Sequence, residues 1–98
     1  MILEVAVLNV KAGQSEAFEA VFVQVAPIIA SMPGCLRHEL QRCLETPDRY
    51  LLLVWWETLE DHTVGFREGP LFKQWRAIVG PFFAAPPVVE HFTLIAKS

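Results

Sequence analysis

The sequence has few charged residues and no run of basic ones. Only 19% of its 98 residues are charged, and the formal net charge is -3. Nucleic-acid-binding domains normally present a basic patch, so we expect no binding to nucleic acid. No apolar run reaches the roughly 20 residues that a membrane-spanning helix needs, so no membrane contact is expected. The opening stretch Met1–Glu4 has no basic segment typical of a signal peptide, and we predict a cytoplasmic location.

Cysteine is scarce as well, with only Cys35 and Cys43. If both lie on one strand they are about 26 Å apart, at about 3.3 Å per residue, which is too far for a disulfide. We therefore expect two free thiols in a reducing compartment. The three histidines, His38, His62 and His91, do not show the spacing of zinc ligands, so no metal site is predicted.

Apolar residues are abundant. They make up 53% of the chain, which is more than a monomer of 98 residues readily buries. The segment Tyr50–Trp56 is apolar throughout, whereas a half-buried strand alternates apolar and polar side chains. Both faces of this strand therefore need a cover. Helices of the same chain can cover one face and a second copy the other, so we predict a homodimer that associates through its sheet faces.

The spacing of apolar residues predicts one domain, residues 1–98, with the order strand, helix, strand, strand, helix, strand. The expected ranges are Ile2–Val10, Gln14–Ser31, Cys35–Glu45, Arg49–Glu57, a helix from Leu59 that is interrupted at Gly69-Pro70 and closed by Gly80-Pro81, and Val88–Ala96. Pro27 should kink or shorten the first helix, and Thr58 and Asp61 resemble a capping box for the second. This order is the α+β, ferredoxin-like split βαβ pattern, with a four-stranded antiparallel sheet and helices on one face.

Several segments resemble the antibiotic biosynthesis monooxygenase family, whose members are small, dimeric α+β barrel proteins. The resemblance covers nearly the whole chain and rests on Val5–Gly13, Pro33-Gly34, Tyr50–His62, Phe66-Arg67, Gly69–Phe72 and Val89–Phe92. Its most recognisable part is the strand that ends in Trp56-Glu57, followed by a helix with an early histidine. The resemblance implies the same fold and a dimer.

The resemblance also implies a function. Some members of this family oxidise electron-rich phenols, anthrones or quinols with O2 and use no metal, flavin or haem. In these enzymes the substrate lies in an aromatic pocket between sheet and helices, where polar groups remove a proton and the substrate itself reduces oxygen. The chain is thus expected to be a cofactor-independent monooxygenase. The alternative is a non-catalytic dimeric domain that binds a small apolar ligand or serves in stress response.

Related members degrade haem, and this reading ranks lower. When the chain is aligned on Gly13, the first-strand asparagine of those members falls on Ala6. Their helix tryptophan falls near Gly65 or Phe66, and their helix histidine near Trp75 or Arg76. The haem pattern is therefore absent at these positions.

His62 is the candidate for the catalytic base or proton shuttle. It is expected one turn into the second helix, and an imidazole near a helix N-terminus tends to stay neutral, which suits a base. The competing interpretation is an exposed or capping residue. The resemblance and the aromatic content together predict a pocket for a flat aromatic ligand. Its candidate binding residues are Trp55, Trp56, Phe66, Phe72, Trp75, His38 and Phe83, each of which is singly explained as well by a place in the core.

Trp55 and Trp56 are neighbours on one strand and so point to opposite faces of the sheet. One should face the helices and the other a partner subunit. The sequence leaves open which of the two faces the pocket.

Overall fold

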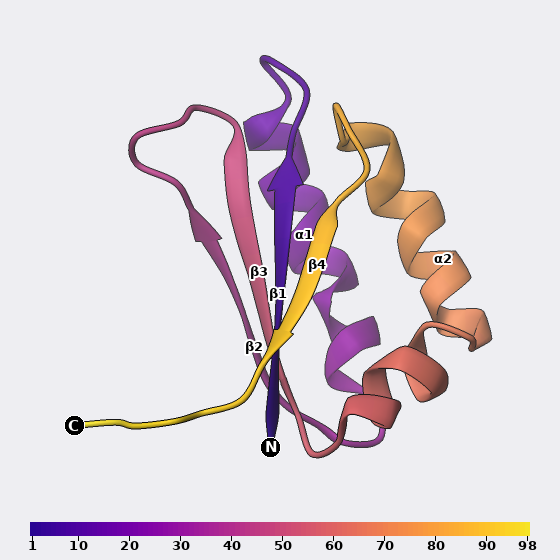
Figure 1. Ribbon diagram of the computed structural model, residues 1–98. Helices are drawn as coiled ribbons and strands as arrows, with labels where there is room; N and C mark the ends of the chain where they lie inside the picture. The colour runs from indigo at the N-terminus through magenta and orange to yellow at the C-terminus, as the bar shows by residue number, and fades with distance from the viewer.

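The computed structural model describes residues 1–98 as a four-stranded antiparallel sheet with its helices on one face (Figure 1). The elements are β1 (Ile2–Asn9), α1 (Ser15–Ala30), β2 (Cys35–Arg42), β3 (Arg49–Trp56), the π-helix η1 (Asp61–Phe66), α2 (Pro70–Val79), the 3₁₀ helix η2 (Gly80–Phe82) and β4 (Val88–Phe92). The strand order across the sheet is β2-β3-β1-β4. This arrangement confirms the predicted ferredoxin-like α+β fold. None of the helices combines the length and the apolar character needed to cross a bilayer.

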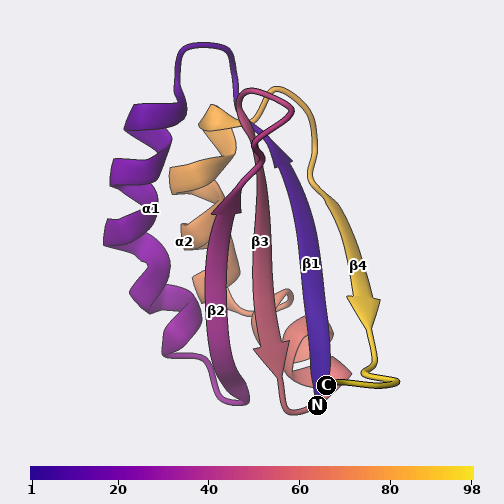
Figure 2. The same cartoon turned by 90° about the vertical axis from the view of Figure 1, so that its left-hand side faces the viewer.

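Alternation along β1 and β3 divides the sheet into a covered face and an open face. On the covered face Ala6 pairs with Leu52 and Leu8 with Tyr50, and all four side chains are buried beneath the helices. Figure 2 shows this two-layer arrangement, with α1 and α2 on the same side of the sheet. The core therefore lies between sheet and helices, as the residue pattern predicts.

Phe18 of α1 is the centre of the core, with no exposed surface. Its ring contacts those of Phe22, Tyr50, Phe82 and Phe83, with ring centroids 5.1 to 6.1 Å apart. The four partners come from α1, β3 and the segment after α2. Phe18 therefore ties the first helix both to the central strand and to the loop that leads into β4.

The open face of the sheet carries no helix. Its central residues are apolar and half-buried: Leu3, Val5, Val7, Leu51, Leu53 and Trp55. At its edge Val88 and Phe92 are 58% and 49% exposed. Both faces of β3 are thus apolar, as the unbroken run in the sequence predicts, but the chain itself covers only one of them.

The bounds of β1, α1 and β3 lie within one residue of the prediction, whereas the ends of β2 and β4 differ by more and Pro27 does not end its helix. The helix α1 continues through Pro27, because this residue lies on the exposed side, where water can bond the carbonyl that loses its amide partner. Strand β2 ends at Arg42 instead of Glu45, because Arg42 already pairs with Tyr50 near the start of β3. Strand β4 ends at Phe92 because this residue pairs with Leu3, near the start of β1.

A β-bulge between Cys35 and Arg37 changes the faces predicted for the start of β2. Cys35 pairs with Trp56 and packs against the core, whereas Leu36 is 51% exposed. Strict alternation counted back from Leu40, which packs against the core, would place Leu36 on the covered face and Cys35 on the open face. The extra residue of a bulge reverses the alternation on one side of it, and nothing in the local pattern signals this.

The second helical region begins at Leu59, as predicted. The backbone N–H of Thr58 donates to Asp61 Oδ2 and the N–H of Asp61 donates to Thr58 Oγ1, both at 3.2 Å, so the capping box is confirmed. The first segment winds as the π-helix η1, and α2 starts at Pro70 after the predicted interruption. This path carries the chain from the end of β3 across the covered face of the sheet.

Candidate active site

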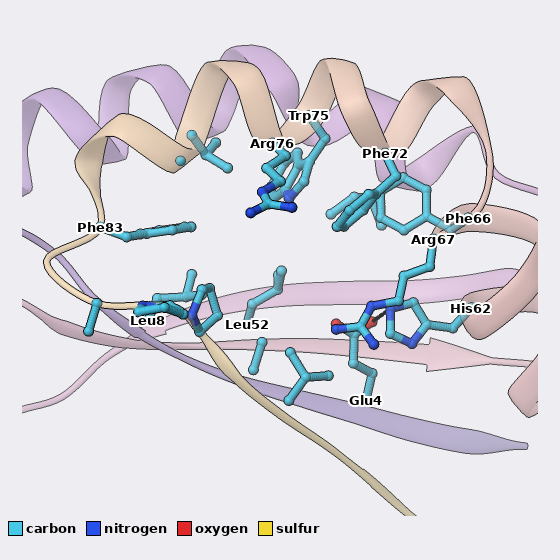
Figure 3. Close-up of a pocket in the computed structure, with 18 of the residues that line it drawn as sticks. Glu4, Leu8, Leu52, His62, Phe66, Arg67, Phe72, Trp75, Arg76 and Phe83 are labelled. Atoms are coloured by element: carbon cyan, nitrogen blue, oxygen red, sulfur yellow. Dashed lines mark ion pairs between the residues drawn. The ribbon is translucent and has the colours of Figure 1, made fainter.

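A cavity of about 520 Å³ lies between α2 and the covered face of the sheet (Figure 3). Its size suits a small organic ligand, since such sites measure about 300–1,000 Å³. Ala6, Leu8 and Leu52 of β1 and β3 form its floor. Its helical wall consists of Phe66, Phe72, Trp75, Arg76 and Val79. Figure 3 shows Phe83 at one end and His62 with Glu4 at the other, so one end of the cavity is aromatic and the other polar.

Glu4 is the buried acid at the polar end. Its side chain interrupts the apolar row of β1 on the covered face, and the residue is only 6% exposed. Its Oε1 accepts a hydrogen bond of 3.0 Å from the indole N–H of Trp56 and lies 3.3 Å from Nε2 of His62. Oε2 of Glu4 forms no hydrogen bond within the chain. No fully buried side-chain nitrogen or oxygen lacks a partner, so Oε2 is not fully buried. This oxygen is therefore open to the cavity that Glu4 lines.

His62 connects Glu4 to His91 of β4. Its imidazole is 2% exposed and stacks on Trp56, with ring centroids 5.4 Å apart and planes inclined by 19°. Its Nδ1 lies 2.8 Å from Nε2 of His91. The contact of Nε2 with Glu4 is a close approach of 3.3 Å, whereas that of Nδ1 with His91 is a hydrogen bond, in which one ring donates and the other accepts. Glu4, His62 and His91 therefore lie in a row of polar contacts that runs from the cavity to β4.

Burial changes the proton affinity of both groups that meet at this end. It raises the pKa of Glu4 above the usual 4.5, although the Trp56 hydrogen bond and the charge of Arg67 act in the opposite direction. Burial also lowers the pKa of His62 to about 4, helped by the nearby His91 and Arg67. His62 is thus neutral at pH 7, and its contact with Glu4 is not an ion pair at that pH. Glu4 binds a proton more readily than a free glutamate does.

Two arginines line the cavity. Arg67, just after η1, lies at the polar end, where its charge acts on both Glu4 and His62. Arg76 extends from α2 into the middle of the cavity, beside Trp75 (Figure 3). Neither guanidinium forms a salt bridge, since the three pairs in the molecule join other residues. No group of three or more His, Cys, Asp or Glu side chains is arranged to hold a metal ion.

Most of the aromatic candidates from the sequence meet at this cavity. Those that line it are His62, Phe66, Phe72, Trp75 and Phe83. Trp55 lies on the open face of the sheet, half-buried, with the guanidinium of Arg37 4.7 Å from its ring centroid. Trp56 has no exposed surface and does not line the cavity, but its indole N–H donates a hydrogen bond to Glu4. His38 lies against Phe22 outside the cavity, with ring centroids 6.4 Å apart.

The sequence did not identify Glu4, Arg67 or Arg76 as site residues. Glu4 left one signal, because it is the only charged side chain in the first strand. Nothing in the sequence marks Arg67 or Arg76 as residues of a site. Their direction depends on how η1 and α2 pack over the sheet.

Comparison with known proteins gives consistent results. The sequence profile described as antibiotic biosynthesis monooxygenase matches residues 1–78. The uncharacterized protein YczJ of Bacillus subtilis is 48% identical over 92 residues, which cover 94% of this chain and 97% of YczJ. The crystal structure of a candidate antibiotic biosynthesis monooxygenase from Bordetella bronchiseptica superposes with a TM-score of 0.93 at 40% identity, over 97% of each chain.

A more distant structure shares the fold. SnoaB, a cofactor-independent oxygenase from Streptomyces nogalater, superposes with a TM-score of 0.78 at 23% identity. The match covers 98% of this chain and 94% of SnoaB.

We expect His62 to remain neutral until the pH approaches 4, well below the ordinary value of 6.5. The unfolded chain binds this proton near pH 6.5, so His62 lowers the stability of the fold as the pH falls from 6.5 towards 4. The titration can be followed by NMR of the imidazole nitrogens, with the His62→Gln variant to assign the signal. A midpoint near 6.5 would show that burial does not control this residue.

Proposed function

The chain belongs to the antibiotic biosynthesis monooxygenase family, and we propose that it is a cofactor-independent monooxygenase that oxidises an electron-rich aromatic compound or quinol with O2. SnoaB, a cofactor-independent oxygenase, has the same fold, so the fold can accommodate this chemistry. The observation that carries the proposal is Glu4, a buried carboxylate with one oxygen open to a cavity walled by aromatic rings.

Glu4 is the proposed base. A general base must reach the proton that it removes, and Oε2 of Glu4 is the free acceptor at the polar end of the cavity. Its raised pKa makes it a stronger base than a free carboxylate. His62 is hydrogen-bonded to His91 through Nδ1, and its Nε2 lies 3.3 Å from Glu4, so its proposed role is that of a proton shuttle behind the base.

Arg67 is proposed to stabilise the anion that forms. Removal of a proton from a phenol or from the CH2 of an anthrone leaves a phenolate or enolate oxygen, and a nearby guanidinium lowers its energy. The rings of Phe66, Phe72 and Trp75 provide apolar surface for a flat substrate. The site can thus hold the ring, remove a proton and support the resulting charge.

The oxidation balances with the substrate as the only reductant. For an anthrone, the carbanion at the ring CH2 transfers one electron to O2, and the two radicals combine to form a peroxide at that carbon. The peroxide then loses water, with protonated Glu4 able to supply a proton to the departing oxygen, and a carbonyl remains. One CH2 and one O2 give one C=O and one H2O.

The open face of the sheet is the proposed homodimer interface. Its apolar residues on β1 and β3 lie uncovered in the single chain, and those on β4 are the most exposed. A second copy that packs with the same face about a two-fold axis would remove this surface from water. The cavity lies on the opposite side of the sheet and stays accessible in such a dimer.

Glu4→Gln should reduce turnover by about 100-fold or more, because general bases contribute about 10²–10⁴-fold. The amide keeps an oxygen that can accept from Trp56 but cannot take up the proton. Oxygen uptake by chelator-treated protein, measured with a panel of anthrones and hydroquinols against a protein-free blank, tests this. Glu16→Gln, at an exposed acid on α1, is the matched control.

Two results would count against the proposal, at different levels. An unchanged rate in Glu4→Gln removes Glu4 from the reaction. Absence of protein-dependent uptake across the panel contradicts the oxygenase itself and favours the non-catalytic, ligand-binding domain. His62→Ala should also slow turnover while leaving the oligomeric state unchanged, because His62 belongs to the shuttle.

For the dimer, we expect analytical ultracentrifugation to give a mass of twice the 11.1 kDa chain. Leu53→Lys should yield monomers, since it buries an unpaired charge in the middle of the proposed interface. Val23→Lys is the control, because Val23 is 74% exposed on α1 and lies away from the open face. A monomeric wild type, or a dimer that survives Leu53→Lys, would refute this interface.

A further inference from the structure

The charge of the cavity is opposite to that of the protein as a whole. The chain carries a formal net charge of -3. The cavity, in contrast, is lined by the guanidinium groups of Arg67 and Arg76 and by one carboxylate, Glu4. His62 adds no charge, because its pKa of about 4 keeps it neutral at pH 7. The cavity therefore has a positive excess that attracts an anion into it.

The two arginines occupy different parts of the cavity. Arg67 lies at the polar end, where Glu4 partly balances its charge. Arg76 points into the middle of the cavity, towards walls formed by Leu8, Leu52 and Phe83 (Figure 3). No acid faces it there, and it forms no salt bridge elsewhere. Arg76 is an exposed residue, so water, and no acid of the chain, balances its positive charge.

We infer that Arg76 binds a carboxylate on the substrate, so that the cavity takes a hydroxylated aromatic acid. A guanidinium can bind a carboxylate through two parallel N–H···O bonds, which fixes orientation as well as charge. Phe72 and Trp75 lie along the cavity between Arg76 and the polar end (Figure 3). A ring held by Arg76 at its acid group therefore rests on these aromatics and presents its other end to Glu4.

This inference rests on the proposed function, because that function supplies the oxidation of the bound acid. The preference for a carboxylate can be measured without any oxidation. Two ligands with the same ring system, 2-naphthoate and 2-naphthalenemethanol, differ in the charge of one substituent. Isothermal titration calorimetry compares their affinities without turnover. The wild type should bind the naphthoate at least about tenfold more tightly, as expected for hydrogen bonds to a charged group.

Variants of two residues on α2 test whether Arg76 causes this preference. Arg76→Gln should bind both ligands with equal affinity. Lys73 is exposed on α2, as Arg76 is, but it does not line the cavity. Lys73→Gln makes the same change of charge there and should keep the preference. Arg76→Lys retains the charge without the two-pronged geometry and should keep part of it. Thermal unfolding of each variant verifies that the fold is intact.

Each outcome decides the matter. Equal affinities in the wild type, no binding of the naphthoate, or a preference that survives Arg76→Gln would overturn the role of Arg76. A wild type that prefers the naphthoate but consumes no oxygen with any hydroxylated ring contradicts the proposed oxidation and supports this inference. If the protein consumes oxygen but binds the two ligands with equal affinity, the proposed oxidation is supported and the role of Arg76 is overturned.

Discussion

The burial of one carboxylate is the constraint on which the candidate site depends. Glu4 lies on the covered face of β1, where an unpartnered acid would destabilise the fold. Trp56 donates a hydrogen bond to Oε1, and His62 lies 3.3 Å from it. Each of the two is itself held in place, Trp56 by the core and His62 by its stacking on Trp56 and its bond to His91. The same burial raises the pKa of Glu4 and keeps His62 neutral. The burial of Glu4 therefore accounts both for the contacts that surround it and for the shifted pKa values of the site.

The central strand β3 links this site to the rest of the chain. Its covered side contributes Leu52 to the cavity floor and Trp56 to the support of Glu4. Its other side contributes Leu53 and Trp55 to the open face. The apolar character of both faces of this strand explains why the helices on one side of the sheet do not complete its burial. It also explains why a second copy is the simplest cover for the other.

The fold was predictable because it depends on local patterns. Alternation along the first strand, the capping box at Thr58 and Asp61, and the interruption at Gly69-Pro70 each specify an element without reference to distant residues. The candidate site was predictable only in part. His62 stood out by its position after the strand end, but its partner Glu4 lies far away in the sequence, and only the packing of η1 over the sheet brings the two together. The bulge at Cys35 and the inward direction of Arg76 likewise depend on tertiary packing.

The most direct test of this account is the pKa of the Glu4 carboxyl group. It can be measured by NMR on protein with ¹³C-labelled glutamate, with the Glu4→Gln variant to assign the signal. The account predicts a midpoint above the ordinary 4.5, because burial outweighs the Trp56 hydrogen bond and the charge of Arg67. A midpoint at or below 4.5 would mean that the site stabilises the anion. Glu4 would then be a structural acceptor for Trp56 and His62, and not a base prepared to take a proton from a ligand.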